Sequence, residues 1–268
     1  MKDASRFPYE NYETLAEPLT VYYPTGEEDI ARWVFLAIEK GGQLLTQLLN
    51  LPMPELEILV VAPTDWSLAP RDEDENDEED VANPHPYWTD AVSPPCLVVP
   101  LELGAIFGAP TQEKLAFMFY HELTLAYLES DPAPWPEEYP LWADEWQLKF
   151  AALWLYYQLS GQSGIVNTDL FEKYAEIFEP EEDGKTPVTI RGFDWYEDTN
   201  AEDYLCYELL LEQFSADLLA KYGPEILTGF LAQYRSGRDV LLSEDVTEML
   251  ASTLGPGGDE WLDSLVYF

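Results

Sequence analysis

The spacing of hydrophobic positions changes character near residue 100, from short apolar runs to long helical periods. Before that point, runs of apolar and β-branched residues bounded by proline predict strands over residues 19–23, 56–62 and 97–99. Between the first two strands, apolar residues recur at helical spacing from Ile30 to Leu48. The first part of the chain is therefore predicted to be a small sheet with one early helix.

The early helix carries two further signals. Thr25 and Glu28 have the spacing of a capping box, which places the start of the helix beside them. Gly41 and Gly42 lie in its middle, where glycine lowers helix propensity, yet the apolar period continues through them.

After residue 100 the chain reads as almost continuously helical. Helices are predicted over residues 111–130, around Glu145, and over residues 168–179, 201–222, 224–235, 243–254 and 258–266. Thr111 is a predicted N-cap, and Thr199 with Glu202 forms a second predicted capping box. Within the helix over 111–130, Leu115 to Tyr120 is apolar or aromatic on every side, which is typical of a helix buried all round. The helix around Glu145 carries a bulky stripe, predicted to be core, of Trp142, Trp146, Phe150, Leu153 and Trp154.

Residues 63–95 separate the second and third predicted strands. This segment contains six prolines and a run of acidic residues, and neither a helix nor a central strand tolerates that combination. The sequence predicts a long, partly mobile loop here. The acids of the run are Asp72, Glu73, Asp74, Glu75, Asp77, Glu78, Glu79 and Asp80.

The net charge of the chain is its most unusual bulk property. The 268 residues include 52 Asp and Glu against 13 Lys and Arg, which gives −39, and without the eight acids of the run the charge would still be −31. A hydrophobic fraction of 47% is that of a folded protein rather than a disordered acidic one. The acidity is therefore a property of the whole surface.

Such a surface restricts the choice of partners. It repels phosphate backbones and anionic membranes, so we expect neither direct nucleic-acid binding nor membrane binding. It favours a basic protein partner. Two interpretations stay open: a solvated surface suited to a salty cytoplasm, and mimicry of DNA or capture of a basic protein.

Two cysteines and the amino-terminal residues bear on the compartment. Cys96 and Cys206 lie far apart and form no CxxC pair, so a disulfide framework is not predicted. The first residues lack the apolar core of a signal peptide, and no apolar run reaches the length of a membrane span. A cytoplasmic location is the expectation.

The segment from Phe119 to Tyr127 contains the start of a zinc-binding motif. In H-E-x-x-H on a helix, two histidines one turn apart hold zinc and the glutamate acts as general base. His121 and Glu122 match the first two positions, but Leu125 stands where the second histidine should be. A leucine side chain has no lone pair to donate. In the absence of metal, His121 is expected to hydrogen-bond Glu122, Glu145 or a backbone carbonyl.

The string HELTLAY, followed by Glu145 twenty residues after Leu125, resembles the thermolysin-type gluzincins, zinc metallopeptidases with a HELTHA run. The resemblance covers roughly residues 97–160. It implies a zincin-like α+β fold in which His121 and Glu145 are vestigial zinc ligands facing each other from adjacent helices. It also implies that Glu122 is a vestigial general base.

Two other ways of binding a metal ion stay open. His85, the second histidine of the chain, lies in the proline-rich loop and is a candidate replacement ligand. A hard cation bound by Glu122, Glu145 and Asp144 is a further alternative. The sequence contains no P-loop, no G-x-G-x-x-G and no G-x-S-x-G.

These observations give one main hypothesis and two alternatives. The fold class is α+β, with a zincin-like domain over residues 1–160, a disordered acidic loop at 68–92, and a helical subdomain over 161–268 packed as one unit. The main hypothesis is a catalytically inactive pseudo-peptidase without cofactor, which binds a basic protein through the acid run. The alternatives are an active zinc metallopeptidase with a replaced ligand, and an acidic DNA mimic or decoy that inhibits a basic protein.

Overall fold

The computed structural model describes residues 7–16, 18–71, 81–180, 184, 186–193 and 201–268. Over these residues the fold is mixed α and β, with a five-stranded sheet and eight α-helices, so the predicted α+β class is confirmed. The chain divides into two compact units, Met1–Ser130 with Gln158–Gly161, and Asp131–Tyr157 with Gln162–Phe268. The first unit holds the sheet and the second is helical. The domain boundary at residue 160 stays a prediction.

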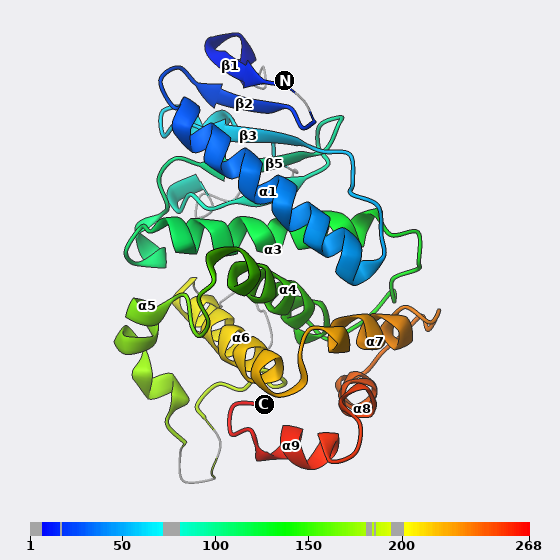
Figure 1. Cartoon of the computed structure of the whole chain (residues 1–268). Helices are drawn as coiled ribbons and strands as arrows, with labels where there is room; N and C mark the ends of the chain where they lie inside the picture. Colours follow the sequence, from blue (N-terminus) through cyan, green and yellow to red (C-terminus); the bar gives the residue numbers. More distant parts are fainter. Residues whose placement is uncertain (1–6, 17, 72–80, 181–183, 185, 194–200) are drawn as a thin grey trace, which may run out of the picture. The chain divides into compact units, whose positions relative to one another are not determined.

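The sheet of the first unit has the strand order β1-β2-β3-β5-β4 (Figure 1). Its strands are β1 Tyr12–Leu15, β2 Val21–Pro24, β3 Glu57–Val61, β4 Tyr87–Thr89 and β5 Cys96–Pro100. The three central strands β2, β3 and β5 run parallel, and both edge strands are antiparallel to their neighbours. The three strands predicted from the sequence correspond to this parallel centre.

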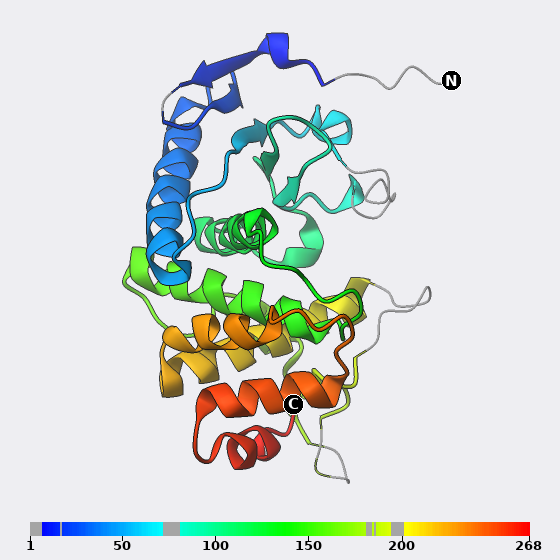
Figure 2. The same cartoon turned by 90° about the vertical axis from the view of Figure 1, so that its right-hand side faces the viewer.

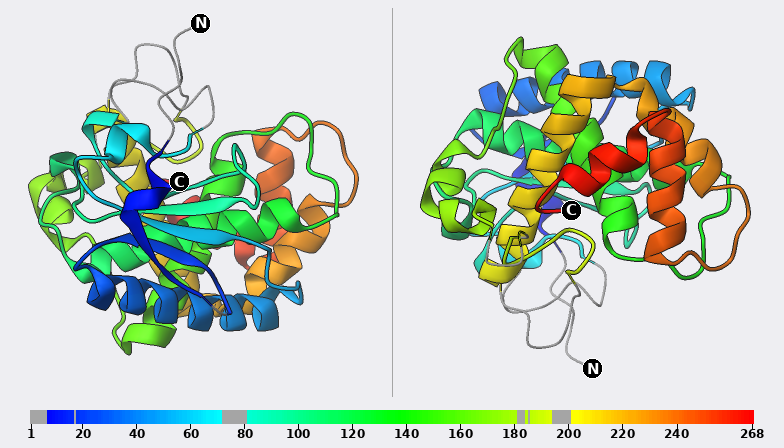
Figure 3. Two further views of the ribbon diagram at one scale, coloured as in Figure 1. Left: turned by 90° about the horizontal axis from the view of Figure 1, so that it is seen from above. Right: turned by 90° about the horizontal axis from the view of Figure 1, so that it is seen from below.

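Both faces of the sheet are covered. Side chains of β3 and β5, including Leu59, Val61 and Val98, pack on one face with Phe7 and Trp66 from the connecting segments. Helix α1, Glu28–Leu49, lies along the opposite face (Figures 2 and 3). Because every residue of β5 is buried, the strand reads in the sequence as a continuous apolar run.

Helix α1 crosses α3, Gln112–Ser130, at its two central glycines. A Cβ on Gly41 would lie 3.2 Å from Leu123, and one on Gly42 would lie 2.9 Å from the sulfur of Met53. The Tyr127 hydroxyl on α3 donates a hydrogen bond of 2.6 Å to the carbonyl of Gly42. The glycines therefore allow a close helix crossing and do not interrupt the helix.

Two local predictions in this unit are wrong. The N-cap residue of α1 is Glu27 and no side chain caps the helix, so the capping box of Thr25 and Glu28 does not form. A turn closed by the Glu27 N–H and the Pro24 carbonyl, with Gly26 at a φ of 95°, takes up Thr25 before the helix begins. The predicted loop over 63–95 contains strand β4. As an edge strand it pairs with a neighbour on one side only, so prolines next to it interrupt few strand-to-strand hydrogen bonds.

The second unit is built from helices. They are α4 Trp142–Ser160, α5 Thr168–Lys173, α6 Ala201–Tyr222, α7 Glu225–Tyr234, α8 Ser243–Leu254 and α9 Gly258–Ser264. The predicted helices agree with these bounds to within a few residues, except that 168–179 is α5 followed by a 3₁₀ turn at Ala175–Phe178. Of the capping box predicted before α6, Thr199 lies outside the described residues.

An aromatic core joins α4, α6 and α7. Trp146 makes edge-to-face contacts with Phe214 and Phe230, with ring centroids 6.3 and 4.8 Å apart. The carboxyl-terminal residue Phe268 packs on Trp142 and Phe214 beside α6 (Figure 3). The aromatic stripe of α4 is thus core, apart from Trp154, which is only partly buried. None of the described helices is long and apolar enough to cross a membrane.

Candidate functional site

Helix α3 holds the residues of the degenerate zinc motif. The Lys114 N–H donates a hydrogen bond of 3.2 Å to the Thr111 hydroxyl, which confirms Thr111 as the start of the helix. Most of the helix is buried, as its apolar sequence predicts. His121 and Glu122 are therefore fixed on a rigid, packed element.

The two side chains contact each other and the sheet. Nδ1 of His121 lies 2.8 Å from Oε1 of Glu122, so the ring N–H donates to the carboxylate. The other oxygen of Glu122 accepts a hydrogen bond of 3.0 Å from the backbone N–H of Trp88 in β4. Both side chains are mostly buried, with 16% of His121 and 15% of Glu122 exposed. The expected contact between His121 and Glu122 is confirmed, and the carboxylate also binds the free edge of the sheet.

Leu125 lies one helical turn after His121, on the same face of α3. It is partly buried and brings only carbon atoms to that face. A catalytic zinc ion needs three protein ligands, so the residues at the motif positions do not fit one.

His85, the candidate replacement ligand, is held by its own surroundings. Its Nδ1 is 2.8 Å from the carbonyl oxygen of Asn83. Its ring packs against Phe107 and Tyr87, with centroids 5.6 and 6.4 Å apart. The segment is fastened by a hydrogen bond of 2.7 Å from the Gly104 N–H to the Pro84 carbonyl. To bind a metal elsewhere, His85 would have to give up these contacts.

Glu145, the third expected ligand, lies in the first turn of α4 and so in the second compact unit, whereas His121 lies in the first. That the two side chains face each other stays a prediction. Throughout the described part of the chain, no group of three or more His, Cys, Asp and Glu side chains is placed to hold a metal ion.

The acid run that we predicted to bind a partner, Asp72, Glu73, Asp74, Glu75, Asp77, Glu78, Glu79 and Asp80, lies outside the described residues. Just before it, the guanidinium of Arg71 lies over the rings of Trp66 and Tyr87, at 4.5 and 4.8 Å from their centroids. The segment is thereby anchored to the sheet up to Arg71.

Sequence reasoning missed a buried polar cluster in the second unit. Lys149 on α4 forms an ion pair with Glu208 on α6. Burial opposes the charge of Lys149, but the neighbouring carboxylates, Glu208 first, outweigh it and raise the pKa of the ammonium group. Glu212, fully buried on α6, accepts a hydrogen bond of 2.6 Å from the Asn167 side chain. The available signal was a lone lysine within an apolar helix, which needs a buried partner.

Asp144 and two buried tyrosines extend this polar region. Burial first, and then the neighbouring Glu145 carboxylate, raise the pKa of Asp144 to about 7. The hydroxyl groups of Tyr207 and Tyr234 are buried in the same unit, and burial raises the pKa of each, with a further rise from the Glu145 carboxylate at Tyr207 and from the Asp144 carboxylate at Tyr234. The carboxyl of Asp144 is therefore a group that changes charge near neutral pH.

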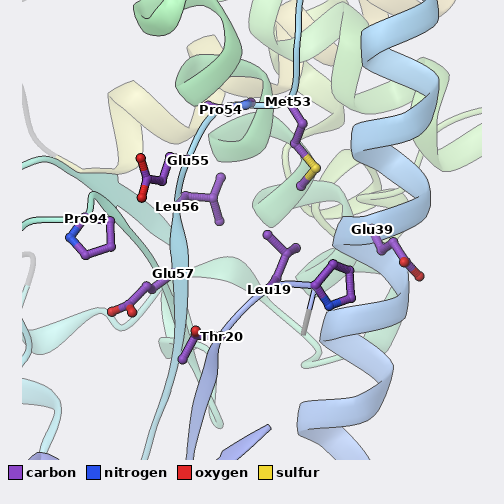
Figure 4. Close-up of a pocket in the computed structure, with 10 residues that line it drawn as sticks. Leu19, Thr20, Glu39, Met53, Pro54, Glu55, Leu56, Glu57 and Pro94 are labelled. Atoms are coloured by element: carbon purple, nitrogen blue, oxygen red, sulfur yellow. The ribbon is translucent and has the colours of Figure 1, made fainter. Parts of the chain in front are cut away.

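A shallow pocket of about 380 Å³ lies in the first unit (Figure 4). Its lining includes Glu39 of α1 and the acidic residues Glu55 and Glu57, and the side chains of Leu19 and Met53 lie between α1 and the segment of Glu55. The Tyr22 hydroxyl lies 3.5 Å from Glu57. The described lining offers three carboxylates and the Thr20 hydroxyl but no histidine or lysine to activate a nucleophile, so we assign it no chemistry.

No protein-family model matches this sequence, and no curated protein sequence is significantly similar to it. The geometry above therefore carries the functional argument.

Proposed function

We propose that this protein is a catalytically inactive, metallopeptidase-like protein that acts by binding a basic protein partner. Its first unit, with a sheet and early helix followed by the helix of His121 and Glu122, is proposed to be zincin-like. Helix α4, which carries Glu145, is proposed to correspond to the helix that supplies the third zinc ligand in the gluzincins. The observation that carries the proposal is the environment of Glu122. Its two oxygens accept hydrogen bonds from His121 and from the backbone of Trp88.

A general base must be within hydrogen-bond reach of the water from which it takes a proton. The Glu122 carboxylate is instead used to join α3 to β4, and Leu125 removes a ligand that would hold the metal. A partial set of ligands neither retains zinc tightly nor lowers the pKa of its bound water to about 7. Residues that resemble part of a peptidase motif thus form a structural contact here.

The binding half of the proposal rests on charge. A net charge of −39 attracts cationic proteins over distances of about one Debye length, roughly 10 Å at 0.1 M salt. The acid run at 72–80 is proposed as the densest part of this surface.

The metal test compares the parent protein with two variants. The dialysed parent is expected to hold no stoichiometric zinc and to cleave no peptide. Leu125→His supplies the missing donor, and zinc should stabilise this variant by mass action while leaving the parent and the Leu125→Gln control unchanged. One equivalent of zinc in the parent with chelator-sensitive proteolysis would establish the atypical peptidase instead.

The binding test uses partners captured on the immobilised protein at 0.05 and 0.5 M NaCl. A second form carries Asn or Gln in place of the eight acids of the run. Binding is expected to fall with salt and with loss of the run. Partners that are indifferent to both changes would refute the electrostatic part of the proposal.

A further inference from the structure

Three exposed apolar side chains lie on two adjoining segments of the second unit. Among the described residues, the large hydrophobic side chains that are most exposed are Leu36, Tyr139, Val240 and Leu242. The last three belong to two chain segments that are joined by a short parallel bridge between Glu138 and Val240. We call Tyr139, Val240 and Leu242 the apolar patch; they are 39%, 50% and 61% exposed.

The patch has a fixed backbone. The Leu241 N–H donates a hydrogen bond of 2.9 Å to the carbonyl of Glu138, and the Glu137 N–H donates one of 2.7 Å to the carbonyl of Asp239. The two segments, which lie about one hundred residues apart in the chain, are thereby held together. The patch is a feature of the tertiary structure and of no single segment.

Aromatic side chains pack against Tyr139, one member of the patch. The ring of Tyr139 stacks on Trp135, with centroids 6.3 Å apart, and meets Tyr234 edge-on at 6.1 Å. The guanidinium of Arg235 lies 3.7 Å from the centre of the Trp135 ring and forms a 2.8 Å ion pair with Asp131. A surface side chain with this support loses little conformational entropy when a partner binds.

The leucine side chain at position 242 has no evident role in stabilising the fold. Leu242 is the N-cap residue of α8, a position that favours Ser, Thr, Asn or Asp. The next residue is Ser243, but its hydroxyl accepts a hydrogen bond of 3.1 Å from the indole of Trp142. Leu242 therefore caps nothing with its side chain and buries little, and a local rule broken without a structural gain points to function.

Acidic residues surround the patch. Glu137, Glu138, Asp239 and Glu244 are exposed next to it in the chain. The nearest cation along the chain, Arg238, is paired with Asp245 at 3.1 Å. A second copy of this protein would bring the same acidic rim against itself, which is unfavourable.

We propose that the apolar patch with its acidic rim is a docking surface for a basic segment of a partner protein that carries lysines or arginines around a few aliphatic or aromatic side chains. This inference rests on the proposed function and names the surface at which the partner's apolar side chains bind. The rim attracts the cations, and the patch removes the apolar side chains from water. Such a division is typical of protein interfaces, which have an apolar centre and a polar rim.

The test uses two labelled synthetic peptides of equal length and charge. One has lysine and leucine at helical spacing, and the other has serine in place of each leucine. Dissociation constants are measured by fluorescence anisotropy at 0.02 and 0.15 M NaCl. The parent should bind the leucine peptide about tenfold more tightly than the serine peptide at 0.15 M.

Two variants locate the effect. Val240→Ser with Leu242→Ser should weaken the leucine peptide to the level of the serine peptide and leave the serine peptide unchanged. The control Leu36→Ser removes a side chain that is 47% exposed in the first unit and should change neither. Glu137→Lys with Glu138→Lys should weaken both peptides. Thermal unfolding of each variant checks that it is folded.

The remaining outcomes separate the two proposals. If both peptides bind with steep salt dependence but the double serine variant binds like the parent, the docking surface is wrong and the proposed function stands. If neither peptide binds at 0.02 M NaCl, the binding function itself fails, and the surface with it. If the parent forms a dimer that the double serine variant loses, a second copy occupies the patch and the inference is overturned.

Discussion

The Glu122 carboxylate acts on a backbone N–H of an edge strand, and a substitution there tests this role. Glu122→Ala removes the acceptor of the Trp88 N–H and the partner of the His121 ring. Leaving a partly buried donor without an acceptor costs about 1–3 kcal/mol, so we expect a loss of that order in urea unfolding. Glu122→Gln keeps an oxygen for Trp88 and should lose less.

The exposed Glu129, on the same helix, provides the control. Glu129→Ala should change the free energy of unfolding by less than about 0.5 kcal/mol. If Glu122→Ala unfolds with the same midpoint as the Glu129 variant, the carboxylate does not join α3 to β4, and the main support for an inert site is lost.

Asp144 should make stability depend on pH. Its pKa is about 7 in the folded protein, mainly through burial and then through Glu145, against about 3.9 when unfolded. Between these values the folded state binds the extra proton, so stability falls as pH rises from about 4 through 7. Hydrogen bonds from the backbone and from the Tyr139 side chain lower the pKa of Asp144 but do not outweigh burial and Glu145.

Asp144→Asn removes the titrating group and keeps an oxygen in place. The variant should match the parent near pH 4 and be more stable by about 2–4 kcal/mol at pH 8. Urea unfolding from pH 4 to 8 measures this, and exposed Asp263→Asn serves as the control. Parallel pH profiles for the parent and Asp144→Asn would show that folding does not raise the pKa of Asp144.

At the scale of elements, the sequence predicted the strands and helices that a local hydrophobic pattern identifies. The central strands β2, β3 and β5 are apolar runs, and the helices follow an apolar period, so both are visible in the chain. Edge strands β1 and β4 were not predicted, because each is three or four residues long and is defined by pairing with a neighbour. The contact of Glu122 with Trp88 was not predictable for the same reason, since it depends on β4.

The turn around Gly104 supports β4 and offers a test at this scale. A Cβ on Gly104 would lie 2.7 Å from the Cα of Asn83, a backbone atom that moves only with the whole segment before β4. Gly104→Ala should therefore destabilise the protein by about 1–3 kcal/mol. Its exposed neighbour serves as the control, and Ala105→Ser should be neutral.

Thermal unfolding of the two variants gives the comparison, and hydrogen exchange at the Trp88 amide shows whether the edge of β4 opens. Equal stability of Gly104→Ala and Ala105→Ser would mean that the segment from Asn83 to Tyr87 adapts freely. In that case His85 would also be less firmly held than its contacts with Phe107 and Asn83 indicate.

At the scale of the whole molecule, the composition determines the net charge but does not indicate the function of that charge. The sequence gives −39 without saying which acids face each other. Lys149 with Glu208 and Glu212 shows that some acids are buried for structural reasons, and such pairs depend on tertiary packing. The bridge that brings the segment of Tyr139 beside that of Val240 was equally hidden, since about a hundred residues separate the two segments in the chain.

The net charge leads to a final prediction: added salt should stabilise the folded protein and weaken its binding to a partner. Self-repulsion of a surface at −39 destabilises the compact state, and NaCl screens it as the Debye length falls from about 30 Å at 0.01 M to about 10 Å at 0.1 M. The melting temperature should therefore rise by several degrees over this range. The form without the eight acids still carries −31 and should keep most of the rise. Partner binding should weaken over the same range, so its loss would not reflect unfolding. A melting temperature that falls with salt would show that attractive ion pairs outweigh the repulsion, and the acidic surface would then need a structural explanation.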